Sequence, residues 1–600
     1  MPSMPAHPRH WLLLALLSAS GSSAAGEPLP PELPFALQHL KPEERARAAR
    51  ALGPLEELPR YQLQLEVDPA ARSVEGHLRV EWRVRGRALE SIPLRLTPNA
   101  QAPRVSISEV KVNGQPVKAR RPEDGLYQLP LAAPLAPGSA VVLELELEGR
   151  VPRAKPGSAS LLGALGASAG GSSEGGDYGA FSAAEDFVSL VGVMPRVPPL
   201  DARGAPWRGP SGVGDLALYE PAHVLASVIV PREWKVHVTG VALGEVPQKD
   251  GRSRYSFAAG AVRDFPVFVS RGYQSAQATV GGVAVESHFA ARDAEVGQRV
   301  LKYAGDALGE FERRLGPLPF TVFRVVEAPL SGGAGGMEFP GLITLGTSLY
   351  RGVGDPGKAL EGMPGMEQVQ GLLQALGGDA GPLGQLGEAL ERTLEFTVAH
   401  EVAHQYFAGL VGSDPVGSPV VDEALAQYAA LLYIEWKHGR AAAEQMRRDS
   451  LVSAYHMLRM SGGRDAPADR PTSDFEDSLQ YGALVYGKAP LLHHASRKLI
   501  GDEAFFKGLR AYVDTYRFKW TCGECFTQEL ARASPGHARE LERLRVRWWK
   551  ETHGDEDLGQ PDLGSLLGGG LNGASQVDPA EALQLMQELL PGLLEGMEQE

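Results

Sequence analysis

The chain has 600 residues, more than one hydrophobic core usually supports, so two or three domains are expected. Its hydrophobic fraction of 43% and charged fraction of 22% are ordinary for a globular protein and exclude overall disorder. The formal net charge of -14, without any long run of Lys and Arg, argues against a nucleic-acid partner.

The N-terminus, MPSMPAHPRHWLLLALLSASGSSAAGE, predicts a cleaved secretory signal over residues 1–25. It has a basic residue at Arg9, an apolar run from Trp11 to Leu17, and small residues leading to Ala25. The apolar run is too short to span a bilayer, and no later stretch is long and apolar enough. We therefore expect an exported protein, periplasmic or secreted, with no integral membrane segment after cleavage.

An N-terminal domain is expected over residues 56–290, after a lead-in over 26–55. The segment YQLQLEV alternates apolar and polar residues, which places Leu63, Leu65 and Val67 on one face of a strand. HLRVEWRV and VLELELE follow the same rule, and VKVNGQPV carries an Asn-Gly hairpin turn. This pattern predicts an antiparallel β domain.

From ARDAEVGQRVLKYAGDALGEFERRLG onward the apolar period becomes helical, which predicts a second domain over residues 291–555. Helices are expected over 386–410 and 422–438. Two Gly-rich segments predict irregular structure: a flexible loop at 154–176 and an insertion at 353–385.

The C-terminal region contains the only two cysteines and a final amphipathic pattern. Cys522 and Cys525 lie in TCGECF, where further soft ligands for a zinc site are lacking. A local disulfide is favoured in an exported chain, with two free thiols as the alternative. Residues 556–600 predict a linker and a short helix that docks on the body of the protein.

The stretch TVAHEVAHQYF contains the residues that indicate chemistry. His400 and His404 lie four positions apart, so on a helix both imidazoles can reach one metal ion. Glu423 follows His404 with eighteen residues between them and begins a second helical pattern. Two imidazoles and one carboxylate leave a fourth position open, as in catalytic zinc sites. Glu401 can then take a proton from the attacking water and deliver it to the leaving amine. A solvent-facing helix is the alternative, but the run is too apolar to suit it.

Together with GGMEF at 335–339 and YGALVYGKAP at 481–490, these residues resemble the aminopeptidase N type of gluzincin zinc metallopeptidases, a family that includes the leukotriene hydrolases. The resemblance covers about residues 55–550. It implies a multidomain fold, with the N-terminal antiparallel β domain followed by a thermolysin-like α/β, mostly helical catalytic domain and a reduced C-terminal helical part. It also implies one Zn²⁺ ion and peptide substrates.

The resemblance assigns catalytic roles to five residues. His400, His404 and Glu423 would be the zinc ligands, and Glu401 the general base. Tyr486 would donate its hydroxyl to the oxyanion of the tetrahedral intermediate, a place where a hydrogen bond strengthens as charge develops.

GGMEF is similar to the family's Gly-x-Met-Glu-Asn motif. By this resemblance Glu338 would bind the free α-ammonium of the substrate, and Gly335, Gly336 and Met337 would line the bound peptide. Phe339 stands where the family has Asn, which leaves the fine shape of the cleft open.

Three further positions depart from the family pattern. Asp422 and Ala424 replace the usual Asn and Gly around the zinc-binding glutamate, and Tyr406 replaces a common Trp. The insertion at 353–385 is longer than expected between the motifs, and we predict that it covers the active-site cleft.

The sequence therefore predicts an exported zinc-dependent aminopeptidase. A zinc endopeptidase or another hydrolase on the same fold remains an alternative, as does a non-catalytic binding protein that kept the fold. The preferred N-terminal residue, the peptide length, the biological role and the oligomeric state are left open.

Overall fold

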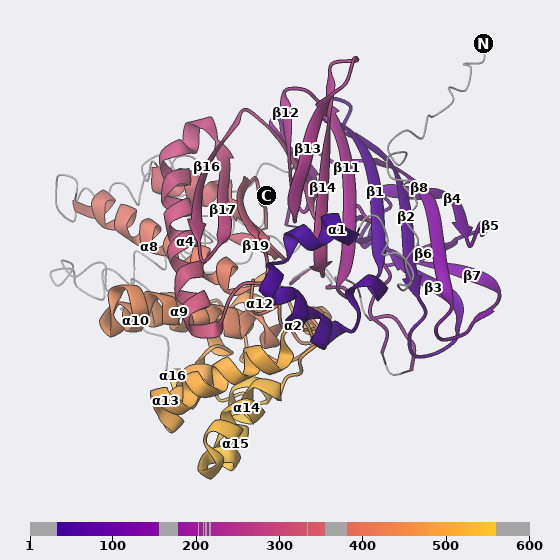
Figure 1. Ribbon diagram of the computed structural model, residues 1–600. Coiled ribbons are helices and arrows are strands. Elements are labelled where there is room, and N and C mark those ends of the chain that lie inside the picture. Colours follow the sequence, from indigo (N-terminus) through magenta and orange to yellow (C-terminus); the bar gives the residue numbers. More distant parts are fainter. Residues whose placement is uncertain are drawn as a thin grey trace.

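The computed structural model describes residues 33–154, 178–354 and 381–559, apart from positions 202, 208, 210–212, 215–217 and 333. These residues form a β-rich N-terminal half and a mainly helical C-terminal half (Figure 1), so the predicted fold class is confirmed. Four predicted segments lie wholly or mostly outside the described residues: the signal at 1–25, the flexible loop at 154–176, the insertion at 353–385 and the helix within 556–600.

The N-terminal half is built on an eight-stranded sheet. Leu63, Leu65 and Val67 are buried on one face of its strand β1, as the alternation predicted. Asn113 and Gly114 both adopt positive φ at the hairpin between β4 and β5, as the Asn-Gly pair predicted. The strand order is β13 (Val241–Pro247), β14 (Arg252–Val262), β11 (Ala222–Pro231), β1 (Arg60–Asp68), β2 (Ser73–Arg83), β8 (Ala140–Arg150), β4 (Val105–Val112) and β5 (Gln115–Pro116).

One pair in this sheet is parallel, namely β1 with β11, whereas the sequence pattern predicted an antiparallel domain throughout. Alternation of side chains does not report strand direction, and the long chain between these two strands allows a parallel crossover.

Two smaller sheets complete the β-rich half. The first contains β3 (Leu89–Arg95), β7 (Leu126–Leu135) and β6 (Arg120–Glu123), in that order. The second contains β12 (Trp234–Val238), β15 (Val267–Arg271), β10 (Phe187–Leu190) and β9 (Phe181–Ala183). Phe187 and Phe268 of the second sheet share an apolar cluster with Val326 and Phe339 of the C-terminal half. The two halves are therefore joined by a common core.

A five-stranded sheet begins the C-terminal half. Its central strands β17, β18 and β20 run parallel, and the edge strands β16 and β19 are antiparallel to their neighbours. Its order is β16 (Tyr273–Val280), β17 (Val283–Ala290), β18 (Val322–Ala328), β20 (Leu342–Gly346) and β19 (Gly336–Phe339). The strand pattern predicted an N-terminal domain that ends at residue 290, but β16 and β17 belong to the sheet of the catalytic half. The pattern within a strand does not reveal which sheet the strand joins.

Helices cover this sheet and form the rest of the C-terminal half. Helix α8 packs against α4 and against the β19–β20 hairpin, and α9 packs on α8. The principal helices are α4 (Ala294–Leu315), α5 (Thr347–Gly354), α8 (Gly381–Ala403), α9 (Glu423–His438), α10 (Arg440–Met446), α11 (Ser453–Met460), α12 (Ser478–Tyr481), α13 (Leu491–Tyr516), α14 (Cys525–Ala533), α15 (Ala538–Arg545) and α16 (Gly554–Leu558). No helix in the described part of the chain is long and apolar enough to cross a membrane.

The lead-in helix α2 (Pro42–Leu52) is fixed to the catalytic half by buried charge pairs. Arg517 donates to Glu44 at 2.6 Å, and Lys41 lies 2.8 Å from Glu312. Removing one partner of such a pair leaves an uncompensated charge. The lead-in is therefore part of the folded body rather than a free linker.

The two cysteines form the local disulfide that the sequence analysis favoured, between Cys522 and Cys525. The disulfide lies at the N-terminus of helix α14, which begins at Cys525.

Candidate active site

Helix α8 carries His400 in its last turn, and His404 follows directly after its last residue, Ala403, in a stretch with many buried apolar side chains. Val398, Ala399, Val402 and Ala403 are fully buried around them. The rings of His400 and His404 meet edge to face at 4.6 Å, with their Nε2 atoms 3.0 Å apart. The i, i+4 spacing on a helix therefore does bring the two imidazoles to one point.

The first residue of α9 supplies a carboxylate to the same point. Glu423 Oε2 lies 3.3 Å from Nε2 of His400 and 3.3 Å from Nε2 of His404. The preceding residue, Asp422, caps this helix by accepting a hydrogen bond from the Glu423 N–H at 3.0 Å, and it accepts another from the Ser413 hydroxyl. Where the family has Asn, this chain thus keeps a side chain that caps the helix.

The donor set fits a single divalent metal ion. One ligand atom from each of His400, His404 and Glu423 lies within 4.8 Å of the others, and all three residues are buried. Two imidazole nitrogens and one carboxylate oxygen with a fourth position open are the ligands of a catalytic zinc site. The three residues would hold Zn²⁺.

Hydrogen bonds behind the imidazoles fix their orientation. His404 Nδ1–H donates to the carbonyl of Phe407 at 2.8 Å, which leaves the lone pair of Nε2 directed at the cluster. Gln427 of α9 interacts with the His400 side chain. The His404 ring is therefore oriented before any metal binds.

Strand β19 presents alternate residues to two different environments. Gly336 lies against the Glu401 side chain, and Glu338 interacts electrostatically with His404 and Glu423. Met337 and Phe339 lie on the opposite face, in the apolar cluster shared with the N-terminal half. Because side chains alternate along a strand, the two sets cannot share a face.

This alternation corrects one expectation about GGMEF and answers one open question. Met337 was expected to line the bound peptide, but its side chain packs in the core. The effect of Phe339 on the cleft was left open, and its side chain is 3% exposed and packs edge to face on Phe268. Gly335 lies beside Thr397 of α8, close to the histidine helix.

Tyr406 and Ala424 are the remaining departures from the family pattern. Tyr406 is fully buried and donates its hydroxyl hydrogen bond to the carbonyl of Gly316 at 2.7 Å. Ala424 is buried inside α9. Neither exchange introduces a group that competes with the imidazoles or with Glu423.

Gln405 was not singled out from the sequence, yet it joins the two parts of the site. Its amide accepts a hydrogen bond from the Gly341 N–H at 2.7 Å and donates one to the Phe339 carbonyl at 3.0 Å. It is fully buried at the end of the histidine helix. These bonds fix the β19–β20 hairpin, and with it Glu338, relative to His404. A glutamine in an apolar run was the available signal, because a buried amide must find partners.

Glu401 is a buried carboxylate on the same helix as the histidines. Its Oε2 atom accepts no hydrogen bond from any described residue. Burial raises its pKa well above the usual value, and the nearby Glu338 and Glu423 raise it further against the opposing effect of His404. Burial likewise raises the pKa of Glu338 to about 7. A divalent cation would offset this crowding of carboxylates, which agrees with the donor set.

Tyr486 lies in a π-helical turn, Gly482–Lys488, beside His400. Its ring is 5.8 Å from the His400 ring and 5.7 Å from the Tyr481 ring, measured between centroids. The structure thus brings Tyr486, His400, His404, Glu401 and Glu423 together from three separate segments of the chain.

Gly336 has room for no side chain, because a Cβ atom there would lie 2.3 Å from Glu401 Oε1. We expect Gly336→Ala to displace the Glu401 carboxylate while leaving the three metal ligands in place. Turnover should fall by about tenfold to a hundredfold, as for a misplaced catalytic group. Steady-state kinetics with metal analysis tests this. Gly305→Ala, whose Cβ would meet only Val280 at 3.4 Å, is the control. Unchanged turnover would show that Glu401 can move freely.

Comparison with known proteins gives one family match and several relatives. The Peptidase family M1 domain matches residues 385–548. Aminopeptidase N of Lactococcus lactis subsp. lactis is 28% identical over 151 residues, which make up 24% of this chain and 17% of that protein. Aminopeptidase N of Streptomyces lividans is 29% identical over 130 residues, 20% of this chain and 14% of that protein. The chain matches less than a fifth of the length of these relatives.

Solved structures extend the likeness over most of the chain. The M1 zinc metallopeptidase from Deinococcus radiodurans aligns with a TM-score of 0.53 at 20% identity, covering 82% of this chain and 94% of that one. A mutant of it bound to a Tyr-Ser-Ala substrate gives a TM-score of 0.52 at 19% identity, covering 82% and 94%. Identity this low establishes a common fold.

Proposed function

Since residues 385–548 belong to the M1 peptidase family, as the sequence resemblance predicted, we propose that this chain is a zinc-dependent aminopeptidase acting on peptides with a free N-terminus. The observation that carries the proposal is the position of Glu338. It shares the strand face of Gly336, which touches Glu401, and it interacts with His404 and Glu423. A carboxylate beside the metal ligands is a natural partner for an α-ammonium group.

Each of the chain's own groups has a distinct task in hydrolysis. A zinc ion held by His400, His404 and Glu423 would supply the Lewis acidity needed to activate a water molecule and to polarise the scissile carbonyl. Glu401 accepts a proton from the attacking water and later transfers it to the leaving amine. Tyr486 donates a hydrogen bond to the oxygen on which negative charge develops. Glu338 holds the substrate's ammonium.

The metal cluster alone does not determine which peptide bond is cleaved, because any amide placed at the cluster would react. Glu338 sets that register, since an ammonium bound to it positions the first peptide bond at the cluster. An internal segment offers no cation, so it would leave the half-buried carboxylate desolvated and unpaired. The site therefore favours removal of one N-terminal residue.

We expect the wild-type protein to hydrolyse free-amine peptides and to ignore their N-acetylated versions. Glu338→Ala should lose much of this discrimination, by about tenfold to a hundredfold in the ratio of kcat/KM values, because a charged hydrogen bond is removed. Glu338→Gln, which keeps the shape but not the charge, is the matched variant. The measurement is kcat/KM for free and acetylated forms of one fluorogenic peptide, with and without chelator. Equal wild-type rates on both forms would refute the proposal.

The alternatives are less well supported. An endopeptidase would need no carboxylate at the position of Glu338, and a non-catalytic binding protein would need neither Glu401 nor Tyr486. All three are present beside the metal ligands.

We also propose that the protein is exported. Support comes from the pattern of residues 1–25 and from the disulfide between Cys522 and Cys525, a bond typical of oxidising compartments. The test is N-terminal sequencing of the protein recovered outside the cytoplasm. Recovery only in the cytoplasm, with residues 1–25 attached, would contradict export.

A further inference from the structure

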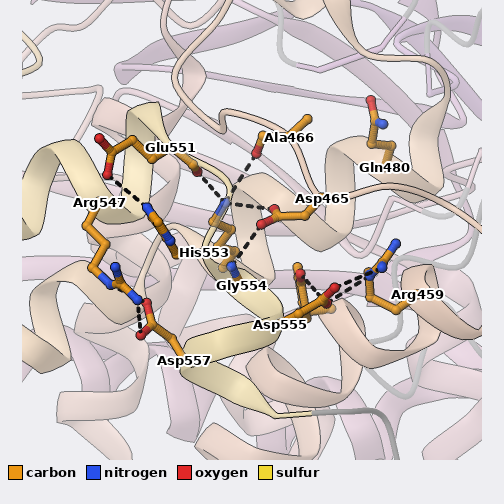
Figure 2. Close-up of polar contacts among 12 residues, drawn as sticks. Arg459, Asp465, Ala466, Gln480, Arg547, Glu551, His553, Gly554, Asp555 and Asp557 are labelled. Atoms are coloured by element: carbon orange, nitrogen blue, oxygen red, sulfur yellow. Dashed lines mark hydrogen bonds and ion pairs between the residues drawn. The ribbon is translucent and has the colours of Figure 1, made fainter.

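Two residues after Tyr486, a lysine is fully buried in the protein. Lys488 is 0% exposed, and its ammonium group has three acceptors. Its Nζ atom lies 2.7 Å from Asp465 Oδ1, 2.8 Å from the Glu551 carbonyl and 3.3 Å from the Ala466 carbonyl. Figure 2 shows Asp465, Ala466 and Glu551 directed at this common point. A buried charge of this kind is tolerated only where all its donors are satisfied.

The acceptors of the Lys488 ammonium group belong to two segments that are hydrogen-bonded to each other. The other oxygen of Asp465 accepts a hydrogen bond from the Gly554 N–H at 2.8 Å. The carbonyl of Trp549 accepts bonds from the N–H groups of Ala468 and Asp469, at 2.9 Å and 3.0 Å. The indole of Trp549 donates to the Ala489 carbonyl at 3.1 Å. Residues 465–469 and 549–554 therefore hold both Lys488 and Ala489 in place.

The turn that contains Tyr486 is also confined from its other side. A Cβ atom on Gly487 would lie 2.9 Å from the Leu451 carbonyl and 3.3 Å from the Ala454 side chain, at the start of α11. Helix α11 is in turn fixed to the C-terminal segment, because Asp555 accepts a hydrogen bond from Tyr455. Asp555 also accepts hydrogen bonds from Arg459 (Figure 2).

We propose that the buried Lys488–Asp465 pair, held by residues 549–554, is the device that positions the Tyr486 hydroxyl over the His400 side of the active site. Tyr486 is half-buried and packs on His400 and Tyr481 through its ring, and the backbone turn that carries it ends at Lys488. Lys488 is a positioning residue, since it touches neither the metal ligands nor Glu401 among the described contacts. Residues 549–554 thereby help to set the position of Tyr486 in the catalytic site.

This inference rests on the proposed function, because it assigns Tyr486 to the developing oxyanion. A purely structural role for Lys488 makes a different prediction. Loss of a structural anchor lowers stability and affects substrate binding, zinc content and turnover alike. Loss of a positioning device lowers kcat and the affinity for a transition-state analogue, and it does so only while the Tyr486 hydroxyl is present.

The experiment is a double-mutant cycle in the full chain. Lys488→Met is made in the wild-type and in the Tyr486→Phe background, and Asp465→Asn, which keeps oxygen acceptors, serves where Lys488→Met does not fold. Lys437→Met is the matched control: its Nζ atom also lies 2.7 Å from a carboxylate, Asp306, but on the protein surface. Readouts are kcat, KM, zinc content, Tm and the inhibition constant of a phosphinic dipeptide.

In the wild-type background we expect Lys488→Met to lower kcat by about tenfold to a hundredfold, with KM and zinc content kept. The inhibition constant should rise by a similar factor. In the Tyr486→Phe background, adding Lys488→Met should change kcat and the inhibition constant by no more than about twofold, because the two substitutions act through one hydroxyl. Lys437→Met should leave all readouts near wild type.

An equal loss of kcat in both backgrounds, or a loss of zinc with Lys488→Met, would overturn the positioning role. Failure of the aminopeptidase proposal would look different. The wild-type protein would then hydrolyse no free-amine peptide, while the phosphinic dipeptide could still report whether its binding depends jointly on Lys488 and Tyr486.

Discussion

Replacing Glu401 with Gln is expected to abolish most turnover while the protein keeps its metal. The amide can still hydrogen-bond to the attacking water but cannot accept its proton, and general-base catalysis contributes about 10²- to 10⁴-fold. Glu401 is not among the residues whose ligand atoms form the metal cluster, and its Oε2 atom is unpaired among the described residues. The measurement is kcat on a free-amine fluorogenic peptide beside zinc analysis, with near one zinc per chain in both proteins.

The matched control for this change is Glu395→Gln, because Glu395 lies six residues earlier on α8 and is also buried. Glu395 accepts hydrogen bonds from Tyr433 at 2.8 Å and His438 at 3.0 Å, away from the cluster. It should cost some stability and little turnover. Wild-type turnover by Glu401→Gln would show that another group takes the proton.

Local patterns in the sequence predicted the secondary structure that positions the site. The apolar alternation in β1 and the Asn-Gly turn after β4 are both found as predicted, because each depends only on neighbouring residues. The helices expected at 386–410 and 422–438 are observed as Gly381–Ala403 and Glu423–His438. The pairing of β16 and β17 with the catalytic sheet could not be predicted in this way, because sheet membership depends on residues far along the chain.

The metal cluster was predictable for a similar reason, since the spacing of His400 and His404 on one helix brings their rings together. Glu338 and Tyr486 needed the family resemblance, because one acid and one aromatic residue carry no local signal. Gln405 and Lys488 were missed, although each is fully buried and makes several hydrogen bonds. Their importance follows from burial, which the sequence pattern around them did not reveal.

The alternation of side chains along β19 shows that residues of one sequence motif can have different roles. The role of each depends on the face of the strand on which its side chain lies. Gly336 and Glu338 point to the cluster, whereas Met337 and Phe339 join the two halves of the protein. The substitution of Phe for the family's Asn therefore concerns the core between the halves. It leaves the Glu338 carboxylate on the face of β19 that is directed at the metal cluster.

Tyr486→Phe is expected to slow turnover by an amount comparable to the loss of one oxyanion donor, about 2.7–4 kcal/mol in the activation free energy. The phenylalanine keeps the ring that packs 5.8 Å from His400, so zinc content, stability and KM should stay near wild type. Only the hydroxyl is removed, and that group matters most in the transition state, where the oxygen of the substrate carries negative charge. The measurement is kcat and KM on a free-amine peptide with zinc analysis.

Tyr481→Phe is the matched control for this prediction, because Tyr481 is the other tyrosine beside the site. Its ring is 5.7 Å from that of Tyr486, but its hydroxyl lies toward Gly214 of the N-terminal half, 3.0 Å from where a Cβ on that glycine would be. Removing this hydroxyl should change kcat little. If Tyr481→Phe slowed turnover and Tyr486→Phe did not, Tyr481 would be the oxyanion donor, and the π-helical turn would have another role. A large loss with Tyr486→Phe alone would assign the donor to the turn that Lys488 anchors.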